Sequence, residues 1–302
     1  MEKQEFQDLL QEKVNEAELV LTKYMPLEEG YQKTVIQAMN YSLKAGGKRL
    51  RPLFMKEVYT LFGGKEEVIE PFMAAIEMIH TYSLVHDDLP AMDNDTMRRG
   101  KETTWKVYGD GMGILAGDGL LNLAFETALK AFSLGDTGAQ ERIVQALQVL
   151  FRKAGIYGMI GGQTADVEAE EQQTPVTMEQ ILFIHEHKTA ALIQASMMVG
   201  AILGNATKEQ LQAVEKCAYN IGIAFQVQDD ILDVIGDTAI LGKKVGSDEA
   251  NHKQTYVTIK GLEESKNTVD TLSKEAISIL KSLPGENPFL EQMILELIHR
   301  TK

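Results

Sequence analysis

The chain has 302 residues, of which 44% are apolar, and a formal net charge of −14 at pH 7. This length can supply one large core, and the negative charge disfavours binding to nucleic acid or to anionic lipid. A single cysteine, Cys217, excludes an internal disulfide and fits a reducing compartment. No apolar run approaches the ~20 residues that cross a bilayer, and residues 1–10 are too charged for a signal peptide. We therefore expect one domain over residues 1–302, cytoplasmic and without an integral membrane segment.

Apolar residues recur at helical spacing along the chain, and no run alternates as a strand would. Pro52 and Pro71 suit the first turns of two helices, and Thr177 and Thr207 each begin a capping-box sequence. The expected helices cover residues 2–24, 31–45, 52–62, 71–89, 111–132, 140–157, 177–203, 207–233, 261–283 and 288–302. The fold class predicted is therefore an all-α bundle of about ten or more helices.

An acidic cluster ends the fourth expected helix, where the sequence DDLPAMDND packs four aspartates into nine residues. Asp87 shares a helix face with His80 and Ser83, at spacings of three and four. Asp93 lies six residues beyond Asp87, on a different face of a straight helix. The helix must therefore bend or end at Pro90, which makes this motif a helix end followed by a loop.

A second acidic cluster, DDILD, ends the helix expected over residues 207–233. The apolar stripe through Phe225 continues to Asp229 and Asp233, which places two carboxylates ~5.4 Å apart along the inward face. Buried carboxylates need cations or water, and hard oxygen ligands suit Mg²⁺. We predict that the two clusters face each other across a cavity and hold Mg²⁺, which binds a diphosphate. The alternative is that these acids are solvated faces, caps or members of ion-pair networks. Asp95 and Asp230 flank the inward positions and can serve as supporting groups.

A basic sequence, GGKRLRP, joins two helices and follows two glycines with three cations, Lys48, Arg49 and Arg51. Glycine lets a backbone approach a ligand closely, and arginine grips phosphate oxygens in pairs. The alternative is an ordinary charged turn. Arg98 and Arg99 can likewise be counter-ions of the neighbouring acids.

Taken together, these motifs resemble those of the trans-isoprenyl diphosphate synthases. The resemblance runs from about Tyr31 to Tyr256 and rests on DDLPAMD with Arg98-Arg99-Gly100, DDILD, GGKRLRP, His80, Gly161-Gly162-Gln163, His187-Lys188-Thr189 and Phe225-Gln226. It implies a homodimeric isoprenoid synthase bundle around a central cavity. It also implies condensation of isopentenyl diphosphate with dimethylallyl or geranyl diphosphate, head to tail, by Mg²⁺-assisted ionisation.

The resemblance also implies roles for single residues. The Mg²⁺ ligands, for three ions with substrate bound, are Asp87, Asp93 and Asp229, with Asp233 a weaker match. The allylic diphosphate is held by Arg98, Lys188 and Lys243. The isopentenyl diphosphate is held by Lys48, Arg51, His80 and Arg99. The catalytic groups are Lys188, with Thr189 and Gln226 beside the reacting carbons.

Product length is expected to depend on Tyr82, five residues before Asp87 and about 7.5 Å down the helix. An aromatic ring there, followed by small Ser83, resembles farnesyl diphosphate synthases, whereas geranylgeranyl synthases carry less bulk. Ordinary core packing of Tyr82 is the alternative. Two other functions stay open: a non-catalytic subunit on the same fold, and a phosphohydrolase in which His86-Asp87 is an HD pair. Val257, where a proline is common in the family, leaves the role of the following lid and of Lys253 open.

Overall fold

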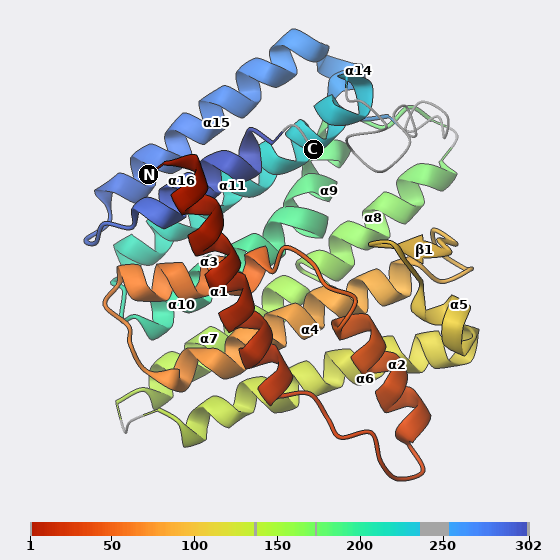
Figure 1. Cartoon of the computed structure of the whole chain (residues 1–302). Coiled ribbons are helices and arrows are strands. Elements are labelled where there is room, and N and C mark those ends of the chain that lie inside the picture. Colours follow the sequence, from red (N-terminus) through yellow and green to blue (C-terminus); the bar gives the residue numbers. More distant parts are fainter. Residues whose placement is uncertain (1, 136–137, 173, 236–253, 301–302) are drawn as a thin grey trace.

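The computed structural model describes residues 2–135, 138–172, 174–235 and 254–300. Its α-helices are α1 (Lys3–Lys23), α2 (Lys33–Leu43), α3 (Leu50–Leu61), α4 (Glu70–Asp87), α5 (Thr104–Tyr108), α6 (Asp110–Leu129), α7 (Gln140–Ala154), α8 (Met159–Glu171), α9 (Met178–Ile184), α10 (Ala191–Leu203), α11 (Lys208–Ile235), α14 (Tyr256–Lys260), α15 (Leu262–Ser282) and α16 (Pro288–Ile298). The predicted all-α fold class is confirmed (Figure 1). None of the helices in the described ranges is long and apolar enough to span a membrane.

Short elements join the helices. Two 3₁₀ segments, η1 (Glu67–Ile69) and η2 (Lys130–Ser133), precede α4 and follow α6. Strands β1 (Met97–Arg98) and β2 (Lys101–Glu102) pair antiparallel, with Met97 opposite Glu102. The sequence predicted no strand, because two residues are too few to show an alternating pattern. This hairpin directly follows the first acidic motif, so it is part of the site described below.

Local signals set several helix boundaries as predicted. The Thr177 hydroxyl accepts a hydrogen bond from the Gln180 backbone N–H at 3.2 Å, and the Gln180 side chain accepts from the Thr177 N–H at 2.9 Å, which completes a capping box. Helix α4 ends at Asp87, before Pro90, and the Asp93 N–H then donates to the Asp87 carbonyl at 2.9 Å. The first acidic motif is therefore a helix end and a loop, as expected from the proline.

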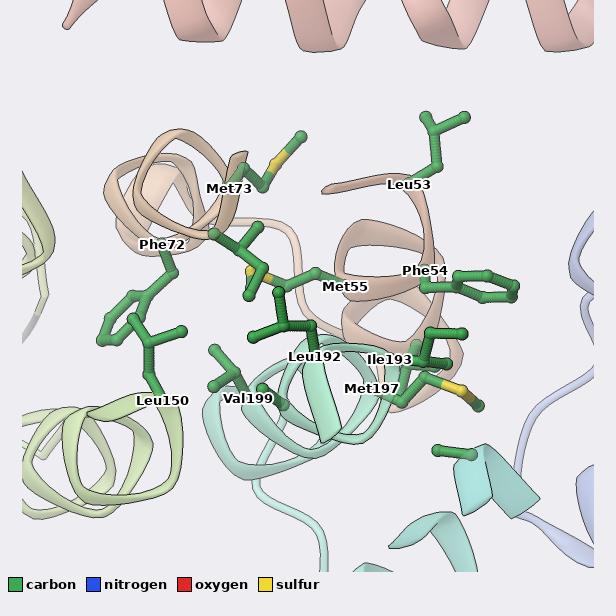
Figure 2. Packing of buried hydrophobic residues seen from close by; sticks show 14 of the residues in the cluster. Leu53, Phe54, Met55, Phe72, Met73, Leu150, Leu192, Ile193, Met197 and Val199 are labelled. Carbon is green, nitrogen blue, oxygen red and sulfur yellow. The ribbon is translucent and has the colours of Figure 1, made fainter. Parts of the chain in front are cut away.

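The core lies where α3, α4, α7 and α10 meet. Every residue of α10 is buried, which explains why its sequence is apolar except for Gln194 and Ser196. Figure 2 shows Leu192 and Val199 of α10 between Met55 of α3 and Leu150 of α7. At Gly200 of α10 a Cβ atom would lie 2.3 Å from the Met55 carbonyl oxygen, so glycine allows α3 and α10 to touch. This packed centre fixes the ends of α4 and α11, which carry the acidic motifs.

Candidate active site

The two adjacent aspartates at the end of α4 have different surroundings. Asp88 is buried, and Arg98 of β1 places both Nε and Nη2 at 2.6 Å from its Oδ1 atom. Burial raises the pKa of Asp88, although the Arg98 guanidinium pulls the other way. Arg98 also lies 3.6 Å from Asp95. The first motif therefore orients Arg98 through Asp88, and Asp95 contributes to the same ion-pair group.

Asp87 is the carboxylate whose environment calls for a cation. Burial raises its pKa from 3.8 to about 6, and the negative charges of Asp93 and Asp166 act in the same direction. Lys188 and Arg98 oppose this shift without cancelling it. Because a divalent cation would offset this accumulation of negative charge, the residues present fit Mg²⁺, with Asp87 and Asp93 as oxygen ligands.

Asp166, on α8, is a site residue that the sequence reasoning missed. It is buried and lies 2.6 Å from the Nζ atom of Lys188, and its charge acts on Asp87. The available signal is the motif Gly161-Gly162-Gln163, which lies between the helices expected from the sequence. Because α8 begins at Met159, the motif lies on a helix, and Asp166 is four residues after Gly162 on its surface.

Lys188 and Thr189 lie on a π-helical turn, His185–Ala190, that joins α9 to α10. The sequence predicted one continuous helix over residues 177–203. The π turn widens the helix locally, a feature often found at functional sites. On the facing helix α8, a Cβ atom at Gly162 would lie 2.1 Å from the Lys188 backbone nitrogen, so this close approach requires glycine. Thr189 donates to the Gln226 side-chain carbonyl at 2.9 Å, which links the turn to α11.

The second acidic motif ends α11. Asp229 accepts a hydrogen bond from Arg300 at 2.8 Å, and the same guanidinium stacks 3.9 Å from the centre of the Phe225 ring. Asp230 is buried, accepts from the Tyr256 N–H at 2.9 Å and lies 3.7 Å from His185. Asp230 therefore anchors α14 to α11, which is a supporting role. Asp233 is also buried.

The basic sequence GGKRLRP begins α3, and its central arginine is structural. Arg49 is buried and donates to Glu18 of α1 at 2.7 Å, to Glu77 of α4 at 2.5 Å and to the Leu43 carbonyl of α2 at 2.6 Å. Lys48, one residue before, is exposed. Arg51 has a buried Nε atom without a hydrogen-bond partner among the described residues. Such an orphaned donor is suited to an anionic ligand.

The strand hairpin brings the second pair of arginines to this loop. Arg99 donates to the Gly46 carbonyl, and Lys101 donates to the Lys44 carbonyl at 3.2 Å. A Cβ atom at Gly47 would lie 2.7 Å from the Arg99 Nη1 atom, so the glycine is needed for this contact. The cations predicted to bind isopentenyl diphosphate, which are separated by some fifty residues, are thus neighbours in space.

His80 faces the same basic group. Its pKa lies well below 6.5, because burial disfavours the imidazolium and because Arg51 and Arg99 repel a further positive charge. His80 is therefore neutral at physiological pH and offers one nitrogen as donor and the other as acceptor. A neutral imidazole can bind a phosphate oxygen as a hydrogen-bond donor without adding charge.

Tyr82 and Ser83 lie one to two turns before Asp87. Tyr82 is 5% exposed, and its hydroxyl has no hydrogen-bond partner among the described residues. Burial raises the pKa of Tyr82 to about 12. Its ring meets that of His86 edge-on at 5.8 Å, and His86 lies 3.0 Å from the Ile114 carbonyl of α6. His86 is thus a contact between α4 and α6.

The structure brings some of the predicted site residues into interaction. The positive charge of Lys188 acts on Asp87, and Thr189 donates a hydrogen bond to Gln226. Among the described residues no three His, Cys, Asp or Glu side chains gather at metal-binding distance. Lys243 and Lys253 lie outside the described residues. The central cavity and the facing of the two acidic motifs across it stay predictions.

The helical fold, the two aspartate motifs and the clustered arginines define the class as a helical prenyltransferase. Residues 32–283 match the family model described as polyprenyl synthetase. The chain is 42% identical over 274 residues to the farnesyl diphosphate synthase of Bacillus subtilis, covering 91% of this chain and 90% of the relative. It is 44% identical over 267 residues to the large subunit 1 of a heterodimeric geranylgeranyl pyrophosphate synthase of Arabidopsis thaliana, covering 87% and 71%.

Two solved structures are similar along their whole length. The geranylgeranyl pyrophosphate synthetase of Pyrococcus horikoshii superposes with a TM-score of 0.87 at 30% identity, covering 98% of this chain and 99% of the other. The geranyltransferase of Helicobacter pylori, complexed with magnesium and isoprenyl diphosphate, superposes with a TM-score of 0.81 at 32% identity, covering 96% and 95%. The chain belongs to the polyprenyl synthetase family. The prediction of a prenyl diphosphate synthase is confirmed at this level.

Proposed function

We propose that this chain condenses isopentenyl diphosphate with geranyl or dimethylallyl diphosphate, head to tail, to give farnesyl diphosphate. One observation carries the assignment: two adjacent residues of the π turn each interact with one of the two motif-bearing helices. Lys188 acts on Asp87 at the end of α4, and Thr189 bonds to Gln226 on α11. A cation for the leaving diphosphate and polar groups for the reacting carbons therefore come from adjacent residues of one turn.

The residues proposed to hold Mg²⁺ are Asp87, Asp93 and Asp229, for three ions with substrate bound. When bound, Mg²⁺ acts as a Lewis acid and stabilises the negative charge that grows on the leaving diphosphate. The elevated pKa of Asp87 supports this role, because its carboxylate is stabilised by a nearby cation. Arg300 is bonded to Asp229 in the structure. A Mg²⁺ ion at Asp229 therefore shares the carboxylate with this guanidinium or displaces it.

The chain's own residues orient the substrates and exclude water. Arg98, Lys188 and Lys243 grip the allylic diphosphate, whose C–O bond breaks with the electron pair leaving on oxygen. The double bond of isopentenyl diphosphate then attacks the allylic cation, and the new cation loses a proton to the departed diphosphate. Lys48, Arg51, His80 and Arg99 hold isopentenyl diphosphate throughout. Exclusion of water from the site keeps the cation from being quenched.

A product assay tests this function. Purified protein is incubated with labelled isopentenyl diphosphate, geranyl diphosphate and Mg²⁺, and the products are separated by chromatography. We expect farnesyl diphosphate, and no product when Mg²⁺ is removed by a chelator. Release of inorganic phosphate without elongation contradicts the proposal and supports a hydrolase. No reaction with any allylic starter supports a non-catalytic subunit.

A geranylgeranyl product is the second candidate, because Arabidopsis thaliana relatives with that name reach 48% identity. The buried ring of Tyr82 supports the shorter product, since it fills space below Asp87. We expect Tyr82→Ala to shift the main product by at least one isoprene unit. Tyr82→Phe is the matched control: it removes only the unpartnered hydroxyl and should leave product length unchanged. An unchanged product from Tyr82→Ala removes Tyr82 from this role.

We also propose a homodimer that pairs through α6. Most residues of this helix are apolar, and its polar side chains Asp118, Asn122 and Glu126 are exposed. Among its apolar residues, Ile114 and Leu115 are 47% and 49% exposed, and Leu129 is half exposed. A second copy is the occupant that the apolar face favours. Leu115→Glu should convert a dimer into a monomer in analytical ultracentrifugation, whereas Leu19→Glu on exposed α1 should not. A wild-type monomer contradicts the proposal.

A further inference from the structure

A buried acid, Glu77, lies in the middle of α4 and has no role in the mechanism above. Glu77 is 2% exposed, and it lies one helical turn before His80. The Arg49 guanidinium donates to it at 2.5 Å. A buried carboxylate is costly unless cations surround it, so its neighbours define what it does.

The negative charge of Glu77 acts on three guanidinium groups. These groups are Arg49, Arg51 and Arg99. For each of them, Glu77 supplies the strongest attraction from a negative charge. Burial lowers the pKa of Arg51 to about 10 and also lowers that of Arg99. Glu77 opposes both effects. Without it, the buried Arg49 would lose its most deeply buried partner, and the repulsion of the exposed Arg99 against Arg49 and Arg51 would have much less compensation.

Glu77 also fixes the start of α3. Arg49 has a left-handed backbone, with φ at 47°, and three bonds hold its side chain to α1, α2 and α4. Such a conformation is unfavourable for a residue with a Cβ atom and persists only when its surroundings impose it. Lys48 and Arg51 flank this anchored residue. The orientation of the Lys48 and Arg51 side chains therefore depends on the hydrogen bonds that Arg49 makes. Of its two carboxylate partners, Glu77 is the more deeply buried.

We propose that Glu77 is a positioning residue for the isopentenyl diphosphate site, acting through Arg49, Arg51 and Arg99 without touching substrate. It supplies the charge that holds these guanidinium groups together against their mutual repulsion, and it leaves an excess of positive charge for the incoming anion. The inference rests on the proposed function, because it assigns these arginines to isopentenyl diphosphate.

The experiment compares Glu77→Gln with Glu57→Gln. Glu57, on α3, is also buried, at 3% exposure, and is also ion-paired, since Lys13 lies 2.7 Å away and Asn287 donates to it at 2.7 Å. It has no described contact with the basic group. Both variants should lose stability, whereas only Glu77→Gln should raise the KM for isopentenyl diphosphate, by roughly 10- to 100-fold. The KM for geranyl diphosphate should stay within about twofold, and Glu77→Asp should restore part of the isopentenyl affinity.

Two further measurements keep the inference testable. If Glu77→Gln does not fold, Glu18→Gln removes the more exposed partner of Arg49 and should raise the same KM by a smaller factor. An equal rise in both KM values, or the same rise in Glu57→Gln, overturns the inference and leaves Glu77 a purely structural group. Absence of any condensation by the wild-type protein overturns the proposed function instead, and the two failures are thus distinct.

Discussion

The arginine side of the site and the carboxylate side are assembled to different degrees. Arg49, Arg98 and Arg99 are each held by a carboxylate or by a backbone carbonyl. On the other side, no three acidic or metal-binding side chains gather among the described residues, and Asp87 has a raised pKa. Protein groups alone can hold the cations in place, whereas the aspartates repel one another until a divalent ion joins them.

The first test separates the two sides by activity and stability. Asp87→Asn should lower the condensation rate by about 100- to 1,000-fold, since a metal ligand is worth several kcal/mol in the transition state. It should also raise the melting temperature of the metal-free protein, because it removes a charge that burial disfavours. Steady-state kinetics and thermal unfolding measure both effects. Asp8→Asn, at an exposed site on α1, is the control and should change neither.

The arginine side should respond in the opposite sense. Asp88→Asn breaks the pair with Arg98. Burial of the Asp88 charge offsets part of what this pair contributes, so we expect a loss of about 1 kcal/mol in the free energy of unfolding. Urea denaturation measures it. The rate of condensation should fall less than in Asp87→Asn. If Asp88→Asn is as stable as the wild type and as inactive as Asp87→Asn, the distinction between the two sides is wrong.

The pH dependence gives a third test of the carboxylate side. The folded-state pKa of Asp87 is about 6, above its ordinary value of 3.8, so the folded protein holds the proton more tightly between these values. This group therefore makes the metal-free protein less stable as the pH rises from about 4 to about 6. Because Mg²⁺ binds the charged form, its apparent affinity should rise roughly tenfold per pH unit over the same interval. Magnesium titrations followed by thermal shift test this, and Asp87→Asn should abolish the dependence.

Sequence reasoning predicted what local signals encode. The capping box at Thr177 and the end of α4 before Pro90 are confirmed, since both depend on residues within one or two turns. The role of Arg49 was not predictable in this way, because its partners Glu18 and Glu77 lie 31 and 28 residues away. Asp166 was missed for the same reason, since its contact with Lys188 spans 22 residues.

The widened turn between α9 and α10 allows catalysis to be abolished while the fold is kept, by a change in helical register. A π turn contains one residue more than a regular α-helix would use over the same rise. Removing a single residue, such as Ala190, should restore an unbroken helix while α10 keeps its place in the core. Lys188 would then be rotated by about 100° against α10, away from Asp166. Deletion of one residue can thus abolish condensation without unfolding the protein.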